Sequence, residues 1–269
     1  MKGEKLYEKV NYISGLKFLF SNYIREYDLS KANINVFYLK GVIDKNLYNK
    51  LMIASREERQ ITIGLLELED RKNIKILADG IIEAKKMLFE ANDIKDSDVL
   101  TIKNDAVFVI NKVLNHTKFG EFLDFKLKNT FTDFIYLKGI EIYYGYNRVT
   151  NTENIQTKGL GKKAYLHKDF MLDFIVYIMS EIEMGNIESA ISSFTDFFND
   201  YTTGKLDIGY YREFNSDAMY SIINSPYKVF TADNDEYTKT NIININYNMN
   251  VLRDLFGYLS DKYFTDIRF

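Results

Sequence analysis

The segment from Asp98 to Val109, Asp-Val-Leu-Thr-Ile-Lys-Asn-Asp-Ala-Val-Phe-Val, places two apolar runs on either side of a short polar turn. Valine, isoleucine and phenylalanine are typical of strands, whereas an Asn-Asp pair favours a turn. The pattern therefore predicts a β-hairpin with Asp105 exposed at its tip. An Asn-Asp turn between strands is most often only a turn, so a function for Asp105 depends on the rest of the chain.

Two upstream segments carry residues that suit nucleotide chemistry. Asp28 lies at the end of a predicted strand and just before a predicted helix, where it can also serve as a helix N-cap. Arg56 and Arg59 are one helical turn apart and can meet a triphosphate from one face of a helix. An ordinary charged helix face gives the same pattern without any ligand.

Taken in order, these segments resemble the three conserved motifs of B-family DNA polymerases. Asp28 and Ser30 match the first motif, in which Asn33 and Ile34 replace the family's Tyr and Pro. The second motif is matched by identity at Gly64, with Arg56 in place of the family's Lys and Gln60 in place of its Asn. In the third motif Asp105 is the second aspartate, and Lys103 stands where the family has the first.

The resemblance continues downstream and covers about residues 24 to 215. Tyr143 matches the tyrosine of a Lys-Lys-x-Tyr element, although Ile140 and Glu141 replace its two lysines. Lys158, Gly159 and Leu160 match a Lys-Gly-Leu segment that leads into the thumb of the family, and Lys162 and Lys163 follow it closely.

This resemblance implies a site and its ligands. It makes Asp28 and Asp105 the catalytic residues and the ligands of Mg²⁺, and it places Arg56, Arg59, Asn33 and Gln60 at the incoming nucleoside triphosphate. Asn33 replaces a tyrosine that discriminates between sugars, and Lys103 adds a cation beside the metal. Primer-template DNA would then be bound by Tyr143, Lys158, Lys162 and Lys163; a solvated basic linker explains the three lysines nearly as well.

Composition sets the outer limits. The chain has 269 residues, 46% of them hydrophobic, and can bury a sizeable core. Its net charge of −3 gives no global attraction to a polyanion, so nucleic acid must be held by local basic clusters. The absence of cysteine and the presence of only two histidines, His116 and His167, exclude the usual zinc sites. The sequence has no apolar stretch that would span a bilayer and no signal-peptide pattern, so we expect a cytoplasmic protein with no membrane partner.

Hydrophobic spacing predicts an α+β fold with an antiparallel, polymerase-type palm sheet, short helical fingers and a helical, thumb-like C-terminal part. Residues 1–43 and 70–150 would form the palm-like domain, residues 44–69 the fingers-like helix and residues 151–269 the thumb-like domain. Helices are expected at 7–23, at 44–68 with Asp44 as the cap, at 74–91, at 168–184, at 187–201 and near 249–259. Strands are expected at 121–127, 132–137 and 140–147, followed by a polar linker at 151–163.

Three kinds of function remain open. The first is a miniature DNA-directed DNA polymerase that adds nucleotides to a primer 3′ end, either templated or terminal, without the family's exonuclease domain, for which the segment before Asp28 has no room. The second is a catalytically inactive, polymerase-derived subunit that binds nucleic acid or acts as a scaffold beside other replication proteins. The third is an unrelated α+β interaction protein.

Overall fold

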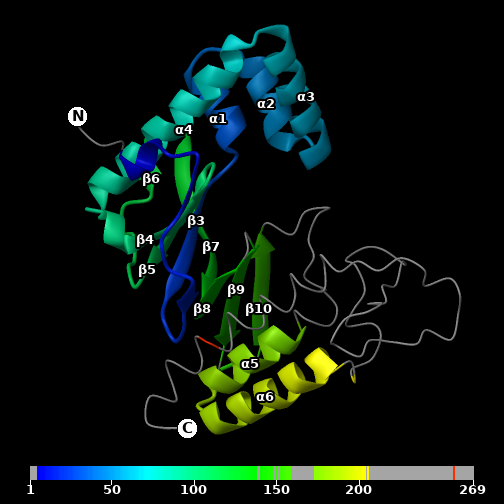
Figure 1. The fold of residues 1–269 in the computed structure, drawn as a ribbon. Coiled ribbons are helices and arrows are strands. Elements are labelled where there is room, and N and C mark those ends of the chain that lie inside the picture. The colour runs from blue at the N-terminus through cyan, green and yellow to red at the C-terminus, as the bar shows by residue number, and fades with distance from the viewer. Residues whose placement is uncertain are drawn as a thin grey trace, which may run out of the picture. The chain divides into compact units, whose positions relative to one another are not determined.

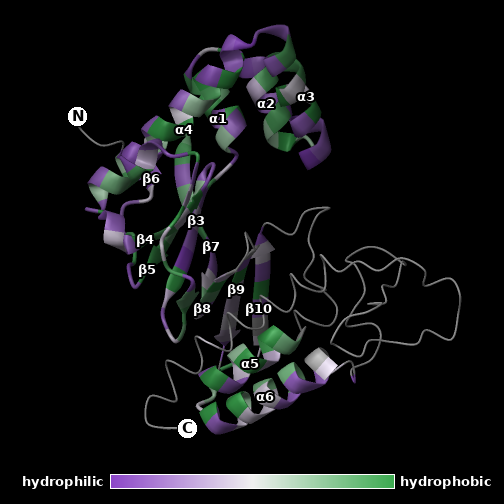
Figure 2. Cartoon of the chain, viewed as in Figure 1, coloured by the Kyte–Doolittle hydropathy of each residue, from purple (hydrophilic) through white to green (hydrophobic). Residues whose placement is uncertain are grey.

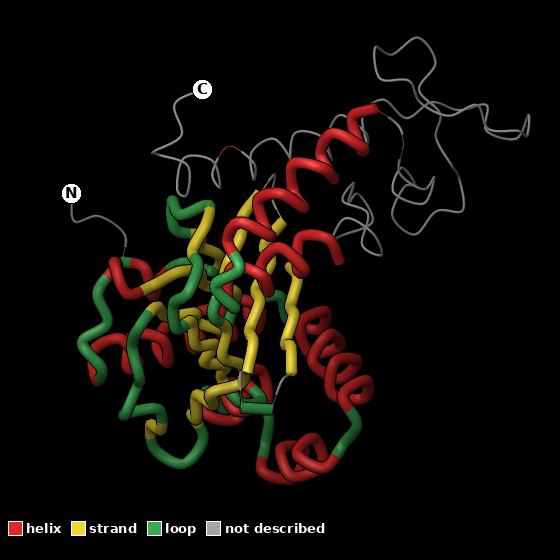
Figure 3. Tube along the Cα trace, turned by 90° about the horizontal axis from the view of Figure 1, so that it is seen from below, coloured by secondary structure: helices red, strands yellow, loops and turns green. Residues whose placement is uncertain are grey.

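The protein has an α+β fold with antiparallel sheets. The computed structural model describes residues 5–137, 140–147, 149–150, 152–158, 173–203, 205 and 257. In these residues, helices and strands follow one another as separate segments of the chain (Figure 3). The chain divides into two compact units, one formed by residues 1–16 and 22–130 and the other by residues 17–21 and 131–269.

The first unit is built on a six-stranded sheet with the strand order β1-β4-β5-β3-β7-β6 (Figure 1). The predicted hairpin is confirmed, although Asp105 is half-buried and not exposed as expected, and the two strands of the hairpin lie inside this sheet, between β1 and β3. Asn104, in the turn, has a positive φ of 50°, a conformation that asparagine tolerates better than most residues. The strands are β1 (Asn11–Ile13), β3 (Ile24–Leu29), β4 (Val99–Lys103), β5 (Ala106–Ile110), β6 (Lys118–Phe119) and β7 (Leu123–Phe131).

The helix α4 (Lys72–Ala91) packs its apolar face on this sheet, as the periodicity of residues 74–91 predicts. Its buried residues Ala84, Leu88 and Phe89 share one core cluster with Val99, Ile102 and Val107 of the hairpin. Two short 3-10 helices, η1 (Leu6–Glu8) and η2 (Asp96–Asp98), precede β1 and β4 in the chain, and Leu6 of η1 belongs to the same core cluster.

Three more helices of the first unit form a second small core, which contains Phe37, Leu51 and Ile63. They are α1 (Ala32–Leu39), α2 (Lys45–Ile53) and α3 (Arg56–Glu69). The cap at Asp44 is confirmed, since its Oδ1 accepts the Leu47 N–H at 2.8 Å. The single helix expected from 44 to 68 is wrong, because Ser55 and Glu58 form a capping box that starts a new helix.

The helix expected at residues 7–23 is also wrong. This segment instead supplies β1 to the first sheet and β2 (Phe18–Leu19) to the second. The apolar residues that gave the helical spacing do not share a buried face, since Val10 is 50% exposed and Leu16 is 41% exposed. Pairing with β4 and β8, about a hundred residues away along the chain, overrides the local pattern.

The second unit holds a four-stranded sheet with the order β10-β9-β8-β2. Strands β8 (Asp133–Leu137) and β9 (Ile140–Asn147) lie where strands were expected. The linker expected at 151–163 is wrong in part, because β10 (Thr152–Lys158) pairs with β9 along its full length. Strand β10 lies at the edge of this sheet, and edge strands commonly carry polar and charged side chains. A polar sequence can therefore form this strand.

Two helices, α5 (Asp173–Glu183) and α6 (Ile187–Thr203), complete the described part of this unit. Both carry hydrophobic and hydrophilic residues along their length (Figure 2), as amphipathic helices do. Phe174 stacks on Phe197 with ring centroids 3.7 Å apart, which joins the two helices. The turn between them includes Gly185, whose φ of 81° is a conformation that glycine adopts readily.

The helix expected near residues 249–259 lies outside the described residues, apart from Gly257, which is helical. None of the helices in the described ranges combines the length and the hydrophobicity needed to cross a bilayer.

Candidate functional site

The two aspartates singled out by the sequence lie beside each other in the first unit. Strand β3 pairs antiparallel with β5, and Asp28 is opposite Ala106, the residue that follows Asp105. The Leu29 N–H donates to the Asp105 carbonyl oxygen at 3.1 Å, which ties the end of β3 to the hairpin turn. Both aspartates are half-buried and face one pocket.

This pocket, which we call the two-aspartate pocket, has a volume of about 340 Å³. It is formed by the end of β3, the first turn of α1, the first two turns of α3, the hairpin turn and one residue of β7. All six residues that the sequence assigns to metal and nucleotide line it. The lining residues are Asp28, Leu29, Lys31, Ala32, Asn33, Ile34, Arg56, Arg59, Gln60, Ile63, Asp105 and Lys128.

Asp105 is the pocket residue whose pKa responds most clearly to its surroundings. Burial raises the pKa of Asp105 above its ordinary value, and the negative charge of Asp28 raises it further. The positive charges of Lys128 and Lys85 act against this rise in the pKa of Asp105. A paired carboxylate of this kind gains from a nearby cation, because the cation offsets the repulsion between the two negative charges.

Lys128 is one basic residue of the pocket that the sequence did not indicate. Its Nζ lies 3.6 Å from Asp28 Oδ2, although half of its side chain is exposed. It reaches Asp28 because β7 lies next to β3, where the Ser30 N–H also donates to the Asp124 carbonyl oxygen at 2.9 Å. The contact between Lys128 and Asp28 follows from the position of β7 next to β3. A lysine in a strand of alternating polar and apolar residues does not indicate that contact in the sequence.

The other basic residues of the pocket come from the loop after β3 and from α3. Lys31, also missed in the sequence, donates from Nζ to the Met52 carbonyl oxygen at 2.8 Å. Arg59 donates from Nη1 to the Ala54 carbonyl oxygen at 2.7 Å, so one edge of its guanidinium holds the junction between α2 and α3. Arg56 is exposed at the start of α3. The pocket therefore combines two acidic with four basic side chains.

Lys103, which the sequence places beside the metal, does not line this pocket. It is the last residue of β4, and β5 separates β4 from β3, the strand that carries Asp28. Lys103 is half-buried and pairs with Asn11 of β1. Lys103 therefore adds no cation to the lining of the pocket.

The residues expected to bind nucleic acid lie in the second unit or outside the described residues. Tyr143 is fully buried, and its hydroxyl donates to Glu141 Oε2 at 2.6 Å, so it packs the core of the second sheet and offers no surface to a nucleic acid. Lys158 ends β10 and is half-buried. Lys162 and Lys163 lie outside the described residues.

The donor set of the two-aspartate pocket fits Mg²⁺ as a cofactor shared with a substrate. Within the ranges that the structure describes, no cluster of three or more acidic or histidine side chains could hold a metal ion by itself. Mg²⁺ is commonly held by one or two carboxylates, with phosphate oxygens and water completing its shell. Asp28 and Asp105 supply that minimum, and the basic side chains around them suit the phosphates.

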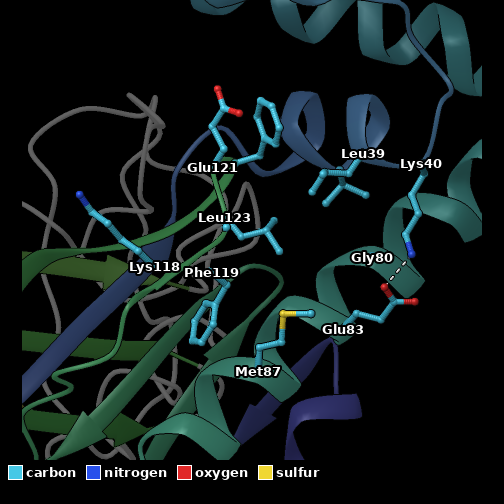
Figure 4. A pocket seen from close by; sticks show the side chains of 12 residues that line it. Leu39, Lys40, Gly80, Glu83, Met87, Lys118, Phe119, Glu121 and Leu123 are labelled. Atoms are coloured by element: carbon cyan, nitrogen blue, oxygen red, sulfur yellow. Dashed lines mark hydrogen bonds and ion pairs between the residues drawn. The ribbon is translucent and has the colours of Figure 1, made fainter.

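A second pocket in the same unit, of about 650 Å³, has a different character (Figure 4). Its lining is mainly apolar, and the Lys40 and Glu83 side chains that border it form an ion pair of 2.6 Å. Leu39, Met87, Phe119 and Leu123 contribute its apolar surface. Its two carboxylates do not converge, because Glu83 is paired with Lys40 and Glu121 lies apart from them (Figure 4). The two-aspartate pocket is therefore the better candidate for chemistry.

Comparison with curated proteins finds no match. Residues 1–258 match the family described as Bacteriophage PBS1 gene 130 protein. Because this match spans nearly the whole chain, the protein belongs to that family.

Proposed function

We propose that the protein is a miniature DNA polymerase that transfers nucleotides to a primer 3′ end with the help of Mg²⁺. The observation that carries this proposal is the convergence of Asp28, Asp105, Arg56 and Arg59 on one pocket from three separate parts of the chain. Their order along the sequence follows that of the B-family polymerase motifs, and the fold supports the same assignment.

The first unit would correspond to a palm with short fingers. Its central hairpin carries Asp105, β3 delivers Asp28 to the same edge, and α4 packs behind the sheet. The helices α2 and α3 would be the fingers, since α3 presents its N-terminal turns to the pocket. The second unit would include the thumb-like part.

Each residue of the pocket would have a distinct task. Asp28 and Asp105 would hold Mg²⁺, which when bound activates the primer hydroxyl and stabilises the leaving pyrophosphate. Arg56 would contact the triphosphate, and Arg59 would use the guanidinium edge that does not bind Ala54. Asn33 and Gln60 would border the sugar and the base of the incoming nucleotide.

A second candidate function is supported by one specific contact. The Lys128 ammonium already neutralises part of the Asp28 charge, as expected in a polymerase-derived subunit that has lost catalysis and only binds nucleic acid or other replication proteins. In that case the palm fold would persist for its packing, and the acidic pair would be a remnant.

Incorporation of labelled nucleotide on primed DNA, measured with and without Mg²⁺, tests the first candidate. We expect D28N and D105N each to abolish incorporation and to leave the thermal unfolding midpoint nearly unchanged. A suitable control is D79N, because Asp79 is an exposed aspartate on α4 outside the pocket. Without incorporation by the wild type on primed DNA, primed RNA or free ends, the catalytic proposal fails. Salt-sensitive binding to primer-template DNA would then support the scaffold candidate.

A further inference from the structure

The helix α4 buries a lysine in the core of the first unit. Lys85 is only 1% exposed and lies on the helix face that also carries Ala84 and Leu88. A buried ammonium group loses its hydration, so an apolar residue of similar length would fill this space at a lower cost in free energy. The burial of Lys85 therefore calls for an interaction that only a cationic or hydrogen-bonding group can make.

A short series of hydrogen bonds leads from Lys85 to the turn that carries Asp105. The Lys85 Nζ donates to the Lys9 carbonyl oxygen at 2.5 Å. The next carbonyl along the chain, that of Val10, accepts the Asn104 N–H at 2.7 Å. Lys85 thus holds the chain segment against which the hairpin turn is fastened.

The charge of Lys85 acts on the same turn. The side chains of Lys85 and Asp105 attract each other electrostatically. Lys85 is buried in the core and is not among the residues that line the two-aspartate pocket. The turn is therefore held by a hydrogen-bonded segment, and Asp105 is attracted by the positive charge of Lys85, whose pKa burial lowers to about 8.

From this geometry we infer that Lys85 is a positioning residue for Asp105: it fixes the hairpin turn through the Lys9–Val10 segment and keeps the carboxylate aimed into the pocket. The effect of Lys85 on catalysis rests on the proposed function. Its effect on the position of the hairpin turn rests on the hydrogen bonds alone. Lys85 touches neither substrate nor metal in this scheme.

The test compares K85M, K85R and K86M. Methionine keeps the length of the side chain and removes both the donor and the charge, whereas arginine keeps both. Lys86 is the matched control, because it is the next residue of α4 and its side chain is exposed. Its Nζ lies 3.8 Å from Glu90 Oε1. Two properties are measured for each variant, namely amide hydrogen exchange at Asn104 and the kinetics of Mg²⁺-dependent nucleotide incorporation.

We expect K85M to speed the exchange of the Asn104 amide at least tenfold and to lower kcat by about tenfold to a hundredfold, with KM for the nucleotide little changed. K85R should recover most of both losses, and K86M should stay within twofold of the wild type. A thermal unfolding scan shows whether each variant is folded under the assay conditions.

The outcomes separate the two proposals. If the wild type is active and K85M matches it in both measurements, Lys85 has no positioning role and the inference is overturned. If the wild type is inactive but K85M still releases the Asn104 amide, the structural part is supported, and the catalytic role falls together with the proposed function. Loss of activity without faster exchange at Asn104 would overturn the hydrogen-bonded route.

Discussion

Asp133 and Glu183 form a buried carboxyl pair in the second unit, and this pair should make stability depend on pH. Asp133 is 0% exposed and Glu183 is 7% exposed. The Ser21 N–H donates to Asp133 Oδ1 at 2.9 Å and the Thr132 hydroxyl donates to Oδ2 at 2.8 Å. Burial, followed by the charge of Glu183 and a hydrogen bond with it, raises the pKa of Asp133 to about 8. Asp133 therefore keeps its proton at neutral pH.

The raised pKa of Asp133 determines whether stability rises or falls with pH. A carboxyl group whose pKa is raised by folding stabilises the native state fully below its unfolded pKa of 3.8, and this stabilisation is lost as the pH rises through about 8. Each pH unit between these limits changes the free energy of unfolding by about 1.4 kcal/mol. From pH 5 to pH 8 the wild type should therefore lose roughly 4 kcal/mol from this group.

The variant D133N removes the titration and keeps the shape of the side chain and an acceptor for Ser21. Urea unfolding followed by far-UV circular dichroism, repeated from pH 5 to pH 9, should show the wild type losing stability relative to D133N as the pH rises. D196N is the matched control, because Asp196 is exposed on α6. Parallel stability curves for the wild type and D133N across this range would refute the raised pKa of Asp133.

Three further predictions concern the first unit. Replacing Ser55 by Ala removes the capping box of α3 and should lower the free energy of unfolding by about 1 kcal/mol, measured by urea unfolding; no change would mean that the break between α2 and α3 is held by other contacts. Gly80→Ala should destabilise the protein by about 1–3 kcal/mol, because a Cβ there would lie 2.3 Å from Val36 Cγ1, and Val36→Ala in the same chain should restore part of the loss. Lys128→Gln should tighten the binding of Mn²⁺ severalfold in titration calorimetry, because it removes a cation that competes for Asp28; weaker binding would contradict this competition.

Much of the first unit follows from local patterns in the sequence. The hairpin, the strand ending near Asp28 and the helix behind them are each specified by neighbouring residues, which is why these elements are confirmed. The edge strands β1, β2 and β10 are specified by their partners instead. The spacing of Val10, Ile13 and Leu16 matches a helix, yet pairing with strands far along the chain determines their conformation.

The candidate site divides in the same way. Residues that belong to ordered motifs, such as Asp28, Arg56 and Asp105, were found from the sequence and are brought together by the fold. Lys128 and Lys85 were missed because their importance depends on the neighbour of β3 and on the inner face of α4. A lysine in a strand or on a helix usually signals a solvated surface, and only the three-dimensional contacts distinguish these two.

The two basic contacts of the aspartate pair differ in how firmly they are held, and this difference bears on catalysis. Lys128 is half exposed, and exposed ion pairs contribute only about 0–1 kcal/mol, so a divalent cation or a phosphate can draw it away from Asp28. Lys85 is enclosed by the core and bonded to Lys9, so it stays in place whatever the pocket contains. A displaceable outer cation and a fixed inner one suit a pocket in which Mg²⁺ and a triphosphate replace Lys128 at the carboxylates. The ion pair of Lys128 with Asp28 is therefore compatible with the active polymerase that we propose.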